Sequence, residues 1–204
     1  MHRARYALEE MLARPPGYDG PRVKGLSFRT NYKAFQRYKG EKVLALALDL
    51  MPPELASAFR YGEILASGWY PTSWYRDMHG AMRSATGLGL ELPRLLGHEG
   101  IREDLESVYK QLLLRMLSPE RLFALSQRLF NTYYSKGSVD VTEQRRGYVR
   151  ARFQGCTGFD ENMWAELLGA NEMLLQMAGA TSVRIVVLSG AGAAEHADAE
   201  ARWT

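Results

Sequence analysis

The sequence predicts an α+β protein that ends in a β-β-α-β-β unit. Apolar residues recur at helical spacing through the first two thirds of the 204 residues. The period changes at Lys136-Gly137, after which apolar and polar residues alternate as they do in strands. Helices and antiparallel strands that are segregated along the chain in this way indicate the α+β class.

The composition is that of an ordinary globular protein, with 46% hydrophobic and 24% charged residues. A net charge of +3 is too small to indicate a nucleic-acid partner by itself. The single cysteine, Cys156, rules out an intrachain disulfide and favours a cytoplasmic location. The longest apolar run, 43–48, is too short to span a bilayer, so we expect a soluble protein without a transmembrane segment.

Two parts of the chain are distinguished by composition. Prolines and glycines at 15–21 break regular structure, so residues 1–21 are interpreted as an N-terminal arm. Residues 22–204 are interpreted as a single domain.

The first helix of the domain separates aromatic from basic residues. We expect a strand over 23–28, then a helix that Gly40 ends. One helix face holds Phe28, Tyr32 and Phe35, and the other holds Arg29, Lys33 and Arg37. This separation predicts a core face and a solvated basic surface. Binding of an acidic partner, an anionic lipid surface or nucleic acid is the alternative.

Further helices follow from apolar spacing and from proline and glycine positions. Helices are expected over 41–50, over 52–60, from Pro71 to about Gly87, and over 92–117 with a possible break near Gly97 or Gly100. The sequence Ser118-Pro119-Glu120 predicts the start of another helix, which runs to about Tyr134.

The last third of the chain supplies the strands. Alternation predicts a hairpin over 139–153 with its turn at Gly147. Asp160 is expected to cap a long helix that Gly179 ends. The two final strands are expected over 183–188 and 197–203.

The stretch GWYPTSWYRD, residues 68–77, concentrates large aromatic side chains. Trp74 begins a stripe with Met78 and Met82, and aromatic residues on both sides of a helix start can fix the entering chain. We therefore expect a core cluster. The alternative is a ligand pocket lined by Trp69, Trp74, Tyr75 and Trp164.

Motifs for catalysis or metal binding are weak. Gly190-x-Gly192 after a strand matches only part of a dinucleotide fingerprint, and Glu195 occupies its third small position. No two histidines lie within five residues of each other, so we expect no metal site and no cofactor. Cys156 is interpreted as a buried loop residue, with acylation or redox modification left open. We expect no enzyme, because no nucleophile–base set is evident.

Three segments carry a family resemblance: SPERLFALSQRLFNTYYSKGSVDV, then GYVRARFQGCTGFDENMWAELLGANEMLLQMAGATSVRIVV, then a closing ARW. They resemble the superfamily that joins 4-vinyl reductase domains, heme–nitric-oxide-binding domains and small subunits of the TRAPP trafficking complex. With VKGLSF and GWYP, the chain is most similar to an uncharacterised paralogous family of this size from myxobacteria. The resemblance implies helices packed on a twisted antiparallel sheet, a dimer, and a non-catalytic sensing or scaffolding role.

The chain departs from the superfamily's functional motifs. Its last hairpin lacks the paired cysteines of vinyl reductases, and the Tyr-x-Ser-x-Arg motif of the heme group is absent. We therefore expect a cytoplasmic regulatory or scaffolding domain that acts through protein partners or as a homodimer. The alternative is a sensor with an internal pocket for a small apolar ligand.

Overall fold

The computed structural model describes residues 19–104 and 118–204 and confirms the α+β class. The first half contains β1 (Arg22–Lys24), α2 (Gly25–Leu50), α3 (Pro53–Arg60), β2 (Trp69–Pro71), α4 (Thr72–Thr86) and α5 (Glu91–Asp104). The second half contains α7 (Pro119–Phe123), α8 (Ser126–Tyr133), β3 (Ser138–Arg145), β4 (Tyr148–Gln154), α9 (Glu161–Met177), β5 (Arg184–Gly190) and β6 (Ala197–Arg202).

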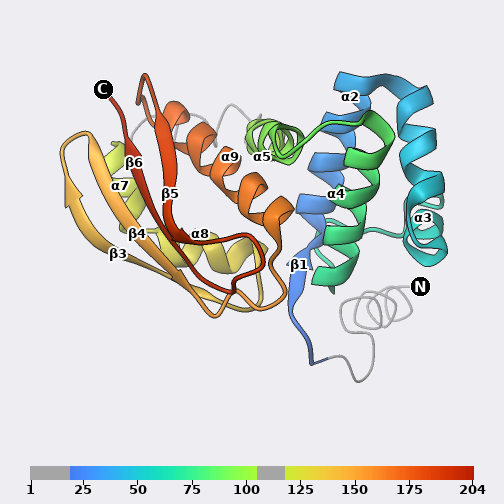
Figure 1. Cartoon of the computed structure of the whole chain (residues 1–204), viewed down its shortest axis with the longest axis horizontal. Helices are drawn as coiled ribbons and strands as arrows, with labels where there is room; N and C mark the ends of the chain where they lie inside the picture. Colours follow the sequence, from blue (N-terminus) through green and yellow to red (C-terminus); the bar gives the residue numbers. More distant parts are fainter. Residues whose placement is uncertain (1–18, 105–117) are drawn as a thin grey trace, which may run out of the picture.

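The main sheet has four antiparallel strands in the order β3-β4-β6-β5. Helices α5 and α9 lie between this sheet and the helices α2, α3 and α4 (Figure 1). One sheet face contributes Val149, Phe153 and Ala199 to the core, while Arg150 and Arg152 project from the other face. The predicted hairpin, the long helix and the two final strands are confirmed.

Local sequence signals start and stop these elements as predicted. The Asp160 carboxylate accepts a hydrogen bond from the Met163 amide at 3.0 Å and so caps α9. The Ser118 hydroxyl accepts from the Arg121 amide at the start of α7. Gly147 has φ = 70° in the turn between β3 and β4, a conformation that glycine adopts without steric cost.

The strand expected over 23–28 is wrong beyond Lys24, because α2 begins at Gly25. The amide of Gly25 donates to the carbonyl of Gly68, which holds the helix start against the chain that enters β2. A side chain at this position would meet the Leu65 carbonyl oxygen. The helix then kinks at Gly40, where φ is 79°, so the two predicted helices are joined in α2.

Gly97 and Gly100 do not break α5. A methyl group on Gly97 would lie 2.0 Å from the Glu166 carbonyl oxygen, and one on Gly169 would lie 1.9 Å from the Arg94 carbonyl oxygen. These glycines therefore allow α5 and α9 to cross with their backbones in contact. The expected continuation to 117 lies outside the described residues.

Two further predictions concern the N-terminal arm and the helix before the main sheet. The expected arm, 1–21, falls outside them except for its last residues. The helix expected over 118–134 is divided into α7 and α8, with Ala124 and Leu125 at the break. None of the described helices is long and apolar enough to cross a membrane.

Candidate functional site

A cavity of about 100 Å³ lies among α2, α5, α7, α8, α9 and the start of the main sheet. Most of its surface is apolar, from Ile101, Leu122, Phe123, Leu129, Phe130, Val139, Ala151, Phe153, Leu167, Ala170, Leu174 and Leu175. Its polar lining residues are Ser27, Thr30, Asn31, Ser126, Tyr133, Tyr134, Glu166 and Asn171. An apolar space with a few polar groups is typical of small-molecule sites.

Helix α9 forms one long wall of the cavity. Glu166, Ala170 and Leu174 recur every four residues and therefore share one face of the helix. At 1.5 Å of rise per residue, the stretch from Glu166 to Leu175 extends over about 13 Å. The cavity is therefore elongated along α9, with a carboxyl group at one end.

The polar end is a buried hydrogen-bonded cluster. The Tyr75 hydroxyl donates to Glu166 Oε1 at 3.1 Å, and the Tyr134 hydroxyl donates to Glu166 Oε2 at 2.8 Å. Asn31 Nδ2 donates to the Tyr75 hydroxyl and to the Ser27 carbonyl, both at 3.0 Å. Helices α2, α4 and α9 and the residue after α8 thus meet at one carboxyl group.

Among the described residues, the carboxyl group of this cluster has no basic partner. Burial raises the pKa of Glu166. The hydrogen bonds that its carboxylate accepts from the two tyrosine hydroxyls lower this pKa and offset part of the effect. The pKa values of Tyr75 and Tyr134 are also raised well above 10, first by burial and then by the Glu166 charge. No lysine, arginine or histidine from the described residues lines the cavity.

One hydrogen-bond acceptor in this cluster is unused. Asn31 is 1% exposed, and its Oδ1 atom has no hydrogen-bond partner among the described residues. A buried polar atom without a partner costs about 1–3 kcal/mol. Asn31 also lines the cavity, so a molecule bound in the cavity could donate a hydrogen bond to Asn31 Oδ1.

The four aromatic residues predicted to line a pocket do not line this cavity. Tyr75 and Trp164 are buried in the core, and Trp69 and Trp74 are half-buried. Trp74 stacks on Tyr70, which fits the core interpretation of GWYPTSWYRD. Of the four, only Tyr75 reaches the site, through its hydrogen bond to Glu166.

The predicted basic surface on α2 is exposed but partly neutralised. Lys33 and Arg37 both pair with Glu103 of α5, at 3.3 and 2.7 Å. Arg29 donates instead to the carbonyl oxygen of Ile64 at 3.3 Å. Lys33 and Arg37 therefore connect helix α2 to helix α5 through ion pairs.

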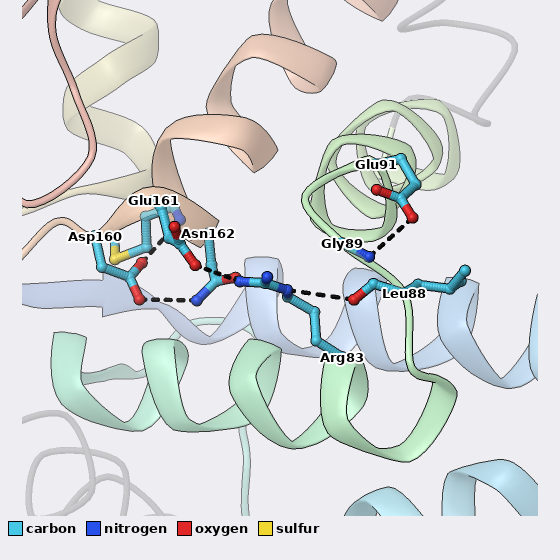
Figure 2. A network of polar contacts seen from close by, with 8 residues as sticks. Arg83, Leu88, Gly89, Glu91, Asp160, Glu161 and Asn162 are labelled. Atoms are coloured by element: carbon cyan, nitrogen blue, oxygen red, sulfur yellow. Dashed lines mark hydrogen bonds and ion pairs between the residues drawn. The ribbon is translucent and has the colours of Figure 1, made fainter.

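A second polar cluster joins α4 to the N-terminus of α9 (Figure 2). Arg83 Nη1 lies 2.5 Å from Glu161 Oε1 and 2.8 Å from Asn162 Oδ1. Arg83 Nε also donates to the Leu88 carbonyl, while Asn162 Nδ2 donates to the Asp160 carboxylate. Opposite charges are matched here, so the cluster fastens helices together.

The remaining reactive groups are closed off. Cys156 is fully buried, as expected, and burial raises the pKa of its thiol to about 12. His79 is also buried, and desolvation lowers its pKa to about 3. In the described residues no group of three or more metal-ligating side chains is assembled.

Comparisons with known proteins find similarity at the level of structure alone. No family model matches the sequence, and no curated protein matches it. The H-NOX protein from K. algicida in its Fe(II) unliganded form is similar, with a TM-score of 0.69 at 12% identity over 89% of this chain and 97% of that one. An oxygen-binding H-NOX domain related to soluble guanylate cyclases has a TM-score of 0.62 at 11% identity, over 89% and 95%.

These likenesses establish an H-NOX-like fold. They support the heme–nitric-oxide-binding part of the expected resemblance at the level of architecture. The likeness to vinyl reductases, to TRAPP subunits and to the myxobacterial family stays a prediction.

The cavity does not fit a heme. Its volume is below the roughly 150 Å³ that accommodates a benzene ring in an engineered cavity, and a porphyrin is several times larger. Among the side chains that ligate heme iron, the described lining offers only Tyr133 and Tyr134, and the Tyr134 hydroxyl is bound to Glu166. His98, next to the lining, has its ring nitrogens 3.1 Å from Glu99 Oε1 and 3.2 Å from Gln176 Oε1.

Sequence reasoning missed Asn31, Tyr134 and Glu166. The signal for Glu166 is present in the sequence, because this acid lies between the apolar residues of MWAELLGA on a face that is otherwise buried. Acids rarely occupy such positions without a partner. Asn31 and Tyr134 gave no comparable signal, since their roles depend on contacts between distant elements.

Proposed function

We propose that this protein is a small-molecule sensor domain whose ligand occupies the cavity along α9. The single observation that carries the proposal is an apolar cavity that ends at the buried Glu166 with an unused acceptor at Asn31. A protein interior that needed only stability would fill this space with side chains. The structural neighbours add support, since one of them is an oxygen-binding H-NOX domain.

We also propose that the domain is non-catalytic. Cys156 is buried with a raised thiol pKa, and Tyr75 and Tyr134 donate to a carboxyl group that is itself buried. A regulatory output through a protein partner or a homodimer, and a cytoplasmic location, stay predictions.

Native mass spectrometry of the purified protein tests the sensor proposal. We expect the wild-type protein to retain a small bound mass, and we expect Ala170→Leu to lose it by filling the cavity. Ala165→Leu is the matched control, because Ala165 lies on α9 and is equally buried but does not line the cavity. A bare wild-type protein, or a bound mass that Ala170→Leu leaves in place, would contradict the proposal.

A further inference from the structure

The polar end of the cavity determines which kind of polar group a ligand can carry. It offers oxygen acceptors: Glu166 Oε1 and Oε2, each of which accepts one tyrosine hydroxyl, and the unused Asn31 Oδ1. An oxygen of this kind has a second lone pair for a further donor. Because no basic side chain of the described residues lines the cavity, a carboxylate or phosphate would enter without a counter-charge.

The carboxyl group has no cation beside it among the described residues. Glu166 is 5% exposed, and its described side-chain partners are the uncharged Tyr75, Tyr134 and Asn31. A buried charge without a partner is strongly destabilising, so a cation that arrives with a ligand would stabilise the ionised form of this acid. Burial raises the pKa of Glu166 in the absence of such a cation, which is consistent with an unfilled partner position.

The rest of the cavity selects for an apolar body. From Glu166 the wall of α9 continues with Leu167, Ala170, Leu174 and Leu175, and Phe130 and Phe153 face the same space. Phe123, Leu129 and Tyr133 of α7 and α8 also line the cavity and are half-buried. The volume of about 100 Å³ is below that of a cavity that holds a benzene ring, so a short alkyl chain suits it better than a ring.

We propose that the cavity binds a small apolar primary amine, with its ammonium group at Asn31 and Glu166 and its apolar part along α9. This inference rests on the proposed sensor function and narrows its ligand to one chemical class. The amine donates hydrogen bonds to Asn31 Oδ1 and to the Glu166 carboxylate, and its charge offsets that of Glu166. The apolar part is removed from water along the leucine side chains of α9.

Three probes with a short four-carbon skeleton separate the head group from the chain. Butylamine, 1-butanol and butanoate share one alkyl chain, and isothermal titration calorimetry of the full chain at neutral pH measures each affinity. We expect butylamine to bind tightest, 1-butanol to bind less tightly, and butanoate to bind at least about tenfold more weakly than butylamine. Equal affinities, or a preference for butanoate, would overturn the amine assignment while leaving the cavity as an apolar binding site.

Absence of binding by all three probes would overturn the sensor function together with the amine assignment. Binding that Ala170→Leu leaves unchanged would do the same, because it would place the probes outside the cavity.

A pair of matched variants tests the role of the buried acid. We expect Glu166→Gln to weaken the binding of butylamine about tenfold or more, and to change that of 1-butanol by less than about threefold, because only the ammonium loses a charge partner. Glu161→Gln on the same helix is the control, since Glu161 is exposed, pairs with Arg83 and does not line the cavity. A uniform loss for all probes in Glu166→Gln would overturn the charge pairing. If that variant does not fold, the ranking of the three probes on the wild-type protein still decides.

Discussion

Helix α9 carries two polar clusters that differ in how their charges are matched. At its N-terminus, Arg83 supplies a cation to Glu161 and a donor to Asn162, close to solvent (Figure 2). Further along the helix, Glu166 is buried, and its partners among the described residues are the uncharged side chains of Tyr75, Tyr134 and Asn31. Structural clusters satisfy their own charges, whereas a cluster that leaves a charge and an acceptor unmatched beside a cavity has the features of a binding site.

The largest effect is expected from Trp164, which lies between the two clusters in sequence. Its indole packs against Phe153 and Phe159, and its Nε1 donates to the Ala194 carbonyl at 3.1 Å. Trp164→Ala should lower the free energy of unfolding by about 3–5 kcal/mol, as large core truncations do. Denaturant unfolding measures it, and an unchanged midpoint would show that α9 does not depend on this ring.

A smaller loss is expected when the buried cluster loses its acid. In Glu166→Leu the hydroxyls of Tyr75 and Tyr134 stay buried without an acceptor, so the free energy of unfolding should fall by about 2–4 kcal/mol. Glu166→Gln keeps one acceptor oxygen and should cost less. Thermal melting of both variants measures the difference, and equal losses would argue against the two hydrogen bonds.

His79 lies beside the buried cluster and should make the stability of the protein depend on pH. It packs edge-on against Tyr75, its Nε2 has no partner among the described residues, and burial lowers its pKa from 6.5 to about 3. Between pH 6.5 and pH 3, His79 is protonated in the unfolded chain but stays neutral in the folded protein. Its contribution to the free energy of unfolding is therefore full above pH 6.5 and is lost as the pH falls. The loss amounts to about 2 kcal/mol between pH 7 and pH 5.

His79→Leu should remove this loss. The raised pKa of Glu166 acts in the opposite direction, because its folded state resists ionisation as the pH rises above 4.5. The measurement is therefore the difference in unfolding free energy between variant and wild type at each pH. A difference that does not change between pH 7 and pH 5 would contradict the buried neutral imidazole.

The smallest effect is expected at the matched cluster. Arg83→Met removes the cation from Glu161, whose side chain is 52% exposed and regains water. We expect a loss of about 1 kcal/mol or less, as is usual for ion pairs near solvent. Unfolding in low and high salt measures it, and a loss as large as that of Glu166→Leu would remove the distinction between the two clusters.

The sequence predicted elements that depend on local signals. Ser118, Asp160 and Gly147 set a helix start or a turn through contacts with near neighbours, and the structure confirms all three. A local reading of the sequence favours a break near Gly97 or Gly100, but the structural reason for Gly97 lies in α9, about seventy residues away in the chain. Tertiary contacts override local preference at such positions.

The site was harder to predict than the fold for the same reason. Tyr75 was found as a candidate, but for a pocket with Trp69, Trp74 and Trp164 that the structure does not assemble around the cavity. Large aromatic residues signal burial in a sequence, whether they fill a core or line a space. The distinction appears only when α2, α4 and α9 are brought together around Glu166.

The glycine contact between α5 and α9 fixes the distance between two helices that both contribute residues to the cavity. Where Gly97 and Gly169 bring the two backbones together, no side chain lies between them that could change rotamer. A bulky residue at either glycine would therefore force these two helices apart, and the lining that they supply would move with them.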